Sequence, residues 1–163
     1  MLDKIISGGQ SGVDRAALDT AIARHIEHGG YCPKGRGAED GIISAKYSLI
    51  ETALQNVEQR TKKNIEQSDA TLVFVSKLPI EVKDGTLLTI NHASFLSKPL
   101  FIIDLSDCKQ ANQNFYDWLK QNNISVLNVA GPRESSDAGM YNRVCKKFDE
   151  MLNFIFNMER AKN

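Results

Sequence analysis

Ser7-Gly8-Gly9-Gln10-Ser11-Gly12 is the stretch that decides the fold, because of the segments on either side of it. A short apolar run, Ile5-Ile6, precedes it and predicts a buried strand. Residues 13–24 follow it, contain neither proline nor glycine, and predict a helix. In such a strand–turn–helix unit, glycines let the backbone approach a phosphate, and the free N–H groups of the first helical turn point at the anion. The stretch therefore predicts a site for a phosphorylated or otherwise anionic small molecule.

The composition favours one domain over residues 1–163 and argues against several classes of partner. Lysine plus arginine total 20, as do aspartate plus glutamate, so the formal net charge is zero, whereas a general nucleic-acid binder usually carries a basic field. No stretch is apolar enough to span a bilayer, and the first residues lack the apolar core of a signal peptide. The three separated cysteines, Cys32, Cys108 and Cys145, indicate reduced thiols. We expect a cytoplasmic protein that binds neither nucleic acid nor membrane.

Apolar runs alternate with helical patterns along the rest of the chain. Expected strands are residues 26–32, 70–75, 100–104 and 126–129, and expected helices are residues 56–67, 86–97, 110–122 and 139–158. This alternation predicts an α/β fold with a mainly parallel sheet and helices on both faces. Residues 33–44 form an expected glycine-rich loop, and residues 42–55 suit either an edge strand or a short helix. In the last helix, Phe154 and Phe156 fall outside the core stripe, which indicates either a subunit interface or an internal aromatic corner.

Ligands of an open parallel sheet bind beyond the carboxyl ends of its strands, so the loops that follow the strands should meet there. Several of these loops carry glycine, and two carry Lys34, Arg36 or Arg133, in a chain without net charge. We therefore expect a focused anion pocket rather than a broad basic patch. The candidate ligand-binding residues are Gly8, Gly9, Gln10, Ser11, Gly12, Asp14, Arg15, Lys34, Gly35, Arg36, Asp84, Gly85, Thr86, Gly131, Arg133, Glu134 and Ser135.

Each motif also has a purely structural interpretation. Ser11 and Asp14 match a capping box, and Gly-Gly-x-x-Gly suits a tight turn without a ligand. The Gly-x-Gly-x-x-Gly order of dinucleotide sites is absent, and Arg36-Gly37 replaces the Lys-Ser/Thr of an ATPase loop. His25, His28 and Cys32 are potential metal ligands, but no fourth ligand is evident. We predict no metal bound directly by protein ligands.

Five longer stretches resemble the molybdenum (cofactor) carrier family. They are residues 7–19, 28–36 and 38–41, then Arg60-Thr61 with Asn64 and residues 68–71, and finally residues 126–135. The family resembles a circularly permuted, YpsA-like branch of the superfamily that contains lysine decarboxylase-like proteins and the Lonely guy phosphoribohydrolases. The resemblance implies a Rossmann-like three-layer sandwich, binding of molybdenum cofactor (molybdopterin), dimers or tetramers, and molybdoenzymes as partners.

The chain departs from its enzymatic relatives at one motif. The phosphoribohydrolases carry Gly-Gly-x-Gly-Thr-x-x-Glu, in which the glutamate is catalytic, and Thr89 stands at that position here. Threonine cannot act as the general acid or base, although Glu39, Asp40 or Glu134 could supply a carboxylate. Asp84 also replaces a glycine that is usual in the carrier family. We expect a carrier or sensor of a phosphorylated anion (molybdenum cofactor or a nucleotide-like ligand); the alternatives are a nucleotide phosphoribohydrolase-like N-glycoside hydrolase and an oligomeric interaction protein.

Overall fold

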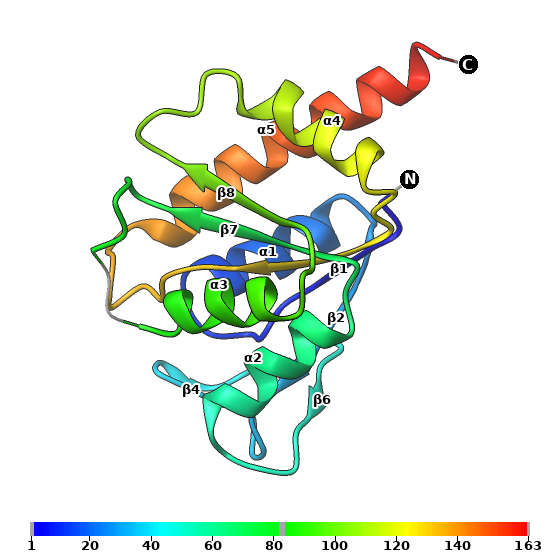
Figure 1. The fold of residues 1–163 in the computed structure, drawn as a ribbon. Helices are drawn as coiled ribbons and strands as arrows, with labels where there is room; N and C mark the ends of the chain where they lie inside the picture. Colours follow the sequence, from blue (N-terminus) through cyan, green and yellow to red (C-terminus); the bar gives the residue numbers. More distant parts are fainter. Residues whose placement is uncertain (1, 82–83, 163) are drawn as a thin grey trace.

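Strands and helices alternate in the computed structural model, which describes residues 2–81 and 84–162 (Figure 1). The strands are β1 (Lys4–Ile6), β2 (Glu27–Gly29), β3 (Tyr31–Cys32), β4 (Gly37–Ala38), β5 (Gly41–Ile42), β6 (Ile50–Glu51), β7 (Ala70–Val75), β8 (Leu100–Asp104) and β9 (Val126–Ala130). The helices are α1 (Val13–Ala23), α2 (Val57–Glu66), α3 (Gly85–Phe95), α4 (Ala111–Gln121) and α5 (Met140–Arg160).

In the described part of the chain, the central sheet has five strands in the order β2-β1-β9-β7-β8, and neighbouring strands in it are parallel. Strand β9 comes from the C-terminal part of the chain but lies between β1 and β7, where Ile6 and Thr71 both pair with Asn128. Two small sheets lie apart from it: β3 with β6, and the hairpin of β4 with β5. The predicted parallel α/β architecture is confirmed, and it is a Rossmann-like sandwich.

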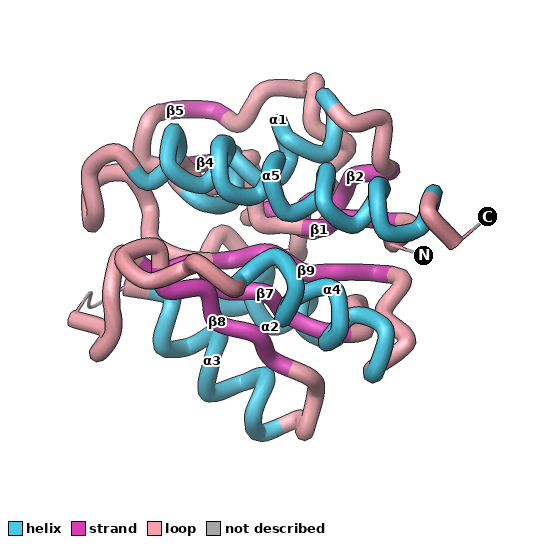
Figure 2. The backbone as a smooth tube through the Cα atoms, turned by 90° about the horizontal axis from the view of Figure 1, so that it is seen from above, coloured by secondary structure: helices cyan, strands magenta, loops and turns pink. Residues whose placement is uncertain are grey.

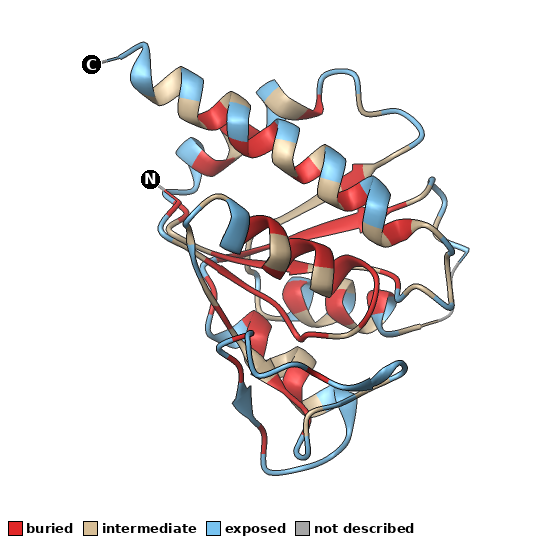
Figure 3. Cartoon of the chain, turned by 180° about the vertical axis from the view of Figure 1, so that it is seen from behind, coloured by how far each residue is buried: buried red, intermediate tan, exposed pale blue. Residues whose placement is uncertain are grey.

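Helices cover both faces of the central sheet (Figure 2). On one face α1 packs against α5, and on the other α2 packs against α3; α4 packs against α5 and β8. Phe74 of β7 meets Phe148 of α5 in an edge-to-face contact with ring centroids 5.8 Å apart. Helix α1 is buried or half-buried except at its C-terminal end, whereas α5 is buried on its inner side and exposed on its outer side (Figure 3). Burial of these apolar stripes is the main force that holds the layers together.

The sequence prediction was wrong in the region between β2 and α2. The expected strand over residues 26–32 is interrupted at Gly30, where φ is 122° and an added Cβ would lie 2.4 Å from the Ser7 carbonyl oxygen. The chain therefore leaves the central sheet after β2 and enters a separate small sheet with β3. The expected loop over residues 33–44 contains the β4–β5 hairpin. Residues 42–55, by contrast, supply β6, so the strand alternative predicted for that stretch is confirmed.

Two further expectations concern helices α1 and α5. The N-cap residue of α1 is Gly12, and no side chain of the described residues caps this helix, so the interpretation of Ser11 and Asp14 as a capping box is wrong. On α5, Phe154 makes an edge-to-face contact with Tyr116, which is the internal aromatic alternative for that residue. Within the described residues, no helix has the length and apolarity needed to cross a membrane.

Candidate functional site

A cleft of about 130 Å³ lies at the carboxyl ends of β1 and β9. Strand β9 is inserted there between β1 and β7, and such a crossing point is where open α/β sheets bind ligands. The loop after β1, the loop after β9, the start of α3 and one side of α2 form its walls. The lining residues are Gly8, Gln10, Asp14, Val57, Arg60, Thr61, Asn64, Asp84, Gly85, Leu88, Thr89, Asn128, Val129, Ala130, Gly131 and Arg133.

Arg60 is the buried cation of this cleft. It lies in the first turn of α2. Asn56 is the N-cap of this helix, and its side-chain oxygen accepts a hydrogen bond from the Gln59 N–H at 3.0 Å. Arg60 is 9% exposed, and its Nη1 donates to Oδ2 of Asp14 at 2.6 Å. Its Nε is buried and has no hydrogen-bond partner within residues 2–81 and 84–162. A buried donor without a partner costs about 1–3 kcal/mol, which an acceptor on a ligand or water would offset.

The glycines of the opening stretch are packed against the protein itself. A Cβ added at Gly8 would lie 1.5 Å from Nη1 of Arg60. At Gly12, where φ is 78°, a Cβ would lie 2.5 Å from the Pro132 carbonyl oxygen and 2.8 Å from the backbone nitrogen of Glu134. The missing side chains therefore let α2 and the loop after β9 approach the start of α1. An anion in this cleft would meet the Arg60 side chain that occupies the space at Gly8.

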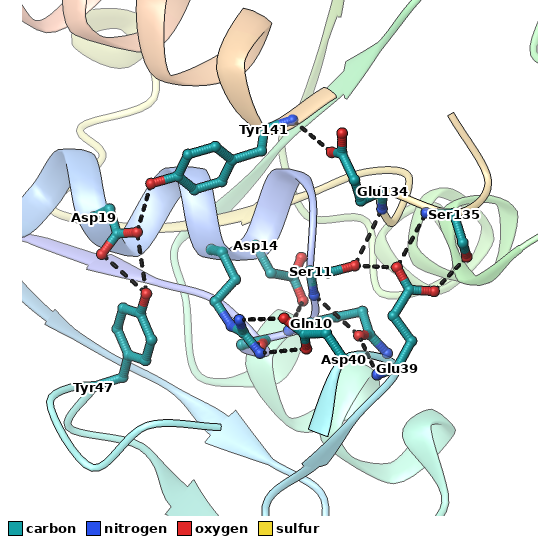
Figure 4. A network of polar contacts seen from close by, with 12 residues as sticks. Gln10, Ser11, Asp14, Asp19, Glu39, Asp40, Tyr47, Glu134, Ser135 and Tyr141 are labelled. Carbon is teal, nitrogen blue, oxygen red and sulfur yellow. Dashed lines mark hydrogen bonds and ion pairs between the residues drawn. The ribbon is translucent and has the colours of Figure 1, made fainter. Parts of the chain in front are cut away.

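A carboxylate, Glu39, is held at the edge of the cleft by the predicted anion-binding residues (Figure 4). Its Oε1 accepts hydrogen bonds from the Ser11 hydroxyl and, at 3.1 Å, from the Ser135 N–H. Its Oε2 accepts one from the Ser135 hydroxyl and lies 3.8 Å from Nε of Arg133. Burial opposes ionisation of Glu39, but the hydrogen bonds from Ser11 and Ser135 outweigh it, so the pKa of this carboxyl is lowered.

The neighbouring Asp40 fixes the same hairpin to α1. Both of its oxygens accept hydrogen bonds from the guanidinium of Arg15 at 2.9 Å, in the bidentate geometry that favours strong pairing. Arg15 lowers the pKa of the Asp40 carboxyl. The Nε of Arg15 donates to the Gly9 carbonyl at 2.9 Å, and its guanidinium lies over the Tyr47 ring. Arg15 thus links the opening stretch to the hairpin.

Lys34, Gly35 and Arg36 do not belong to the lining of the cleft. The guanidinium of Arg36 donates to four backbone carbonyls, those of Ile43, Ser44, Tyr47 and Leu49, at 2.9–3.1 Å. Lys34 is exposed, and the Gly35 N–H donates to Glu51. In this structure Arg36 therefore organises the segment between β5 and β6, and its charge is directed at protein carbonyls.

Asp84 and Thr86 form the start of α3 at the opposite wall. Oδ1 of Asp84 accepts from the Thr86 N–H at 2.9 Å and from its hydroxyl at 2.5 Å, which caps the helix. Oδ2 of Asp84 is buried and finds no hydrogen-bond partner in the described part of the chain. The Thr89 hydroxyl donates to the Gly85 carbonyl at 3.1 Å. Asp84 therefore brings a second carboxylate into the lining, besides that of Asp14.

Glu134 closes the start of another helix, α5. Its carboxylate accepts from the backbone N–H groups of Gly139 at 2.5 Å and Tyr141 at 2.9 Å. The Tyr141 hydroxyl in turn donates to Asp19, which also accepts from Tyr47 (Figure 4). Burial and the Asp19 carboxylate raise the pKa of Tyr141. Glu134 therefore orders the loop after β9 from outside the cleft.

The described residues contain no group of three or more His, Cys, Asp or Glu side chains suited to a metal ion. Cys32 is buried, and that burial raises the pKa of its thiol. Nε2 of His28 accepts a hydrogen bond from the Ser48 N–H at 3.3 Å.

Nine lining residues were not among the sequence-predicted site residues: Arg60, Thr61, Asn64, Val57, Leu88, Thr89, Asn128, Val129 and Ala130. The resemblance did mark the first three as part of a shared motif. Helical periodicity gave no reason to bring α2 to the edge of the sheet, because that approach depends on the packing of α2 against α3 and on Asn64. The Asn64 side chain accepts from the Tyr31 N–H at 2.7 Å and donates to its carbonyl at 3.0 Å.

The parallel sheet and the cleft at its crossing point define the protein as a Rossmann-like α/β protein. Residues 5–152 match the circularly permutated YpsA SLOG family, and the chain belongs to that family. It is also similar to a crystal structure described as a "putative molybdenum carrier protein" from Syntrophus aciditrophicus SB. The two are 40% identical, the match covers 94% of each chain, and the TM-score is 0.85. Comparison with curated proteins found no match.

Proposed function

We propose that the cleft binds a phosphorylated anionic small molecule and that the protein acts as its carrier or sensor. The observation that carries the proposal is Arg60, a nine-tenths buried arginine in the cleft wall whose Nε lacks a partner among the described residues. Arg133 lies at the same cleft with a side chain that is 46% exposed, so a second guanidinium is accessible to a ligand. Guanidinium groups bind phosphate oxygens with charge-assisted hydrogen bonds.

The similar crystal structure is described as a molybdenum carrier protein, and the resemblance to the molybdenum (cofactor) carrier family suggests one candidate ligand. This ligand is molybdenum cofactor, a pterin with a phosphate group. In this proposal Arg60 and Arg133 bind the phosphate, and the apolar side chains of Val57 and Leu88 contact the ring system. Nucleotide-like ligands share the same combination of phosphate and flat ring. Homo-oligomers, molybdoenzyme partners and a cytoplasmic location remain predictions that accompany this function.

The decisive experiment is to identify what the protein carries. Native mass spectrometry of the freshly purified protein should detect a bound phosphorylated molecule. Denaturation of the protein should release this molecule, so that its mass identifies it. Isothermal titration with AMP, ADP-ribose and isolated molybdopterin then ranks ligands. Arg60→Lys should lower the affinity for the tightest-binding ligand by about tenfold or more, because a lysine cannot reproduce the planar, bidentate donors of the guanidinium. Lys34→Ala, which removes an exposed charge away from the cleft, is the matched control. Absence of binding by all ligands would refute the proposal.

A hydrolase is the second candidate, and Asp84 is the observation in its favour. Glu39, Asp40 and Glu134 are all occupied by hydrogen bonds, whereas Oδ2 of Asp84 is unpartnered among the described residues and lies in the cleft wall. An N-glycoside hydrolase needs such a carboxylate beside the scissile bond. Release of adenine from AMP, abolished in Asp84→Asn, would support this function; tight AMP binding without release would favour the carrier.

A further inference from the structure

We propose that the donors around Glu39 form a second anion subsite, for a phosphoryl group, which the β4–β5 hairpin fills with its own carboxylate until an anion displaces it. The proposal goes beyond the proposed function, because Ser11 and Ser135, which supply most of the donors, do not line the cleft of Arg60. We call the group of Ser11, Arg133 and Ser135 the Glu39 cradle.

The Glu39 cradle directs several donors from two separate loops at one carboxylate. Ser11, in the loop after β1, supplies a hydroxyl, and Ser135, in the loop after β9, supplies both a hydroxyl and a backbone N–H. Arg133 adds a guanidinium nitrogen 3.8 Å from Oε2. Hydroxyl, backbone N–H and guanidinium are the donors that bind phosphoryl oxygens in proteins.

The orientation of Ser11 is fixed by the protein. Its side-chain oxygen accepts a hydrogen bond from the Glu134 N–H at 3.2 Å, so its own proton is free to point at Glu39. Ser11 is 9% exposed and directly precedes Gly12, the N-cap of the 11-residue helix α1. The positive end of the α1 dipole therefore adds to the attraction for an anion in the Glu39 cradle.

Glu39 itself lies on a small element that can be displaced. Strands β4 and β5 have two residues each and pair only with one another in the described structure. A hairpin of this size is not stable alone in water, so its position depends on the contacts of its tip. Those contacts are the cradle for Glu39, the Arg15 pair for Asp40, and a hydrogen bond from the Glu39 N–H to Oε1 of Gln10 at 3.0 Å. An anion that takes the place of Glu39 removes the first of them.

The Glu39 cradle also adjoins the cleft. Gln10 and Arg133 line the cleft and contact the hairpin tip as well. The cleft volume of about 130 Å³ is below the roughly 300–1,000 Å³ of most small-molecule sites. Displacement of Glu39 would join the Glu39 cradle and the cleft into one larger site. One phosphoryl group of the ligand would lie in the Glu39 cradle and the rest of the ligand in the cleft.

Removal of the internal carboxylate should expose the subsite. We expect Glu39→Ala to bind inorganic phosphate about tenfold more tightly than the unaltered protein in isothermal titration, because an internal competitor lowers the fraction of open sites. The gain should disappear in Glu39→Ala/Ser135→Ala. Glu58→Ala is the matched control for net charge, since Glu58 is exposed on α2 and pairs only with Lys62 in the described structure. It should bind phosphate as the unaltered protein does.

Three results would overturn the proposal: no gain in Glu39→Ala, an equal gain in Glu58→Ala, or a gain that survives loss of the Ser135 hydroxyl. Circular dichroism and thermal unfolding verify that each variant folds, and Glu39→Gln repeats the test if Glu39→Ala does not fold. Titration with AMP separates a free anion from the phosphoryl group of a larger ligand. Arg60→Lys in the Glu39→Ala background should reduce the gain in affinity for AMP and leave the gain in affinity for inorganic phosphate unchanged. A wrong assignment of the cleft and a wrong assignment of this subsite therefore give different results.

Discussion

Gly8 and Arg60 occupy one volume, since a Cβ at residue 8 would lie 1.5 Å from Nη1 of the arginine and 2.5 Å from its Cζ. The relationship joins the loop after β1 to helix α2 across 52 residues of sequence. It explains why the glycine is needed at this position even in the absence of a ligand. It also places a buried guanidinium where a glycine-rich turn alone would offer only backbone N–H groups.

Gly8→Ala should displace the Arg60 side chain. We expect a loss of about 1–3 kcal/mol in the free energy of unfolding, because the added methyl group overpacks a filled site, together with weaker binding of any ligand that contacts Arg60. Urea denaturation measures the first effect and isothermal titration the second. Gly37→Ala is the control, because no heavy atom of residues 2–81 and 84–162 lies within 4 Å of the Cβ it would add. Equal effects of the two substitutions would contradict the packing argument.

Asp14 and Arg60 should behave as one energetic unit. Their side chains are 8% and 11% exposed, so loss of either partner leaves a buried charge unpaired and should cost about 3–5 kcal/mol. The double variant Asp14→Ala/Arg60→Met should cost less than the sum of the single variants, by about 1–3 kcal/mol. Denaturation of all four proteins at neutral pH provides the cycle. Strict additivity would show that the pair is not coupled.

Arg36 should matter for stability more than Lys34. Arg36→Lys retains the charge but can satisfy only part of the four carbonyls, so we expect a loss of about 2 kcal/mol in the free energy of unfolding. Lys34→Ala, at an exposed position, should change stability by less than about 0.5 kcal/mol. Phosphate affinity, measured for both variants, should stay near that of the unaltered protein. A large loss of phosphate affinity in Arg36→Lys with no loss of stability would indicate instead that Arg36 contacts the ligand.

The hairpin tip should make stability depend on pH in the acid range. Contacts in the folded protein lower the pKa values of Glu39 and Asp40, so the unfolded chain binds more protons as the pH falls. Their stabilisation is complete above the unfolded values of about 4.3 for Glu and 3.9 for Asp, and it is lost as the pH falls through the lower folded values. Glu39→Gln/Asp40→Asn should therefore be less stable than the unaltered protein at neutral pH. The difference should shrink toward about pH 3. If the two proteins differed in stability by the same amount at neutral pH and at about pH 3, ionisation of Glu39 and Asp40 could not be the cause.

Asp84 should limit the affinity for phosphorylated ligands. Its Oδ2, which has no hydrogen-bond partner among the described residues, adds negative charge to the cleft. Asp84→Gly and Asp84→Asn should therefore both increase the affinity for AMP several-fold. Loss of the cap should cost Asp84→Gly only a few tenths of a kcal/mol in stability, since glycine is itself tolerated at an N-cap. A decrease in affinity for AMP in both variants would instead indicate that Asp84 accepts a hydrogen bond from the ligand.

The sequence predicted the sheet well because its strands are apolar and its helices periodic. Strand β7 was predicted at its observed bounds, Ala70–Val75, and β8 likewise at Leu100–Asp104. The β4–β5 hairpin was missed because two-residue strands have no measurable period. Its position depends on long-range contacts of Glu39 and Asp40, which a local pattern does not contain.

The sequence predicted where the candidate site lies better than it predicted which side chains form it. The loops after β1 and β9 do meet at the edge of the sheet, with Gly8 and Arg133 in one cleft. Glycine spacing indicated an anion at the start of α1, but it could not show that Arg60 fills the space beside Gly8 or that Glu39 already holds Ser11. Both depend on side chains from segments more than 25 residues away in sequence.

The insertion of β9 between β1 and β7 has a consequence for biosynthesis. The Ser7 hydroxyl donates to the Val129 carbonyl at 2.6 Å, a contact that spans 122 residues, so the two halves of the sheet cannot join until the segment after residue 125 has left the ribosome. Contacts this distant in sequence slow folding and leave apolar strand edges uncovered in the nascent chain. We expect the nascent protein to require chaperone protection until β9 emerges, and to gain its cleft only near the end of translation.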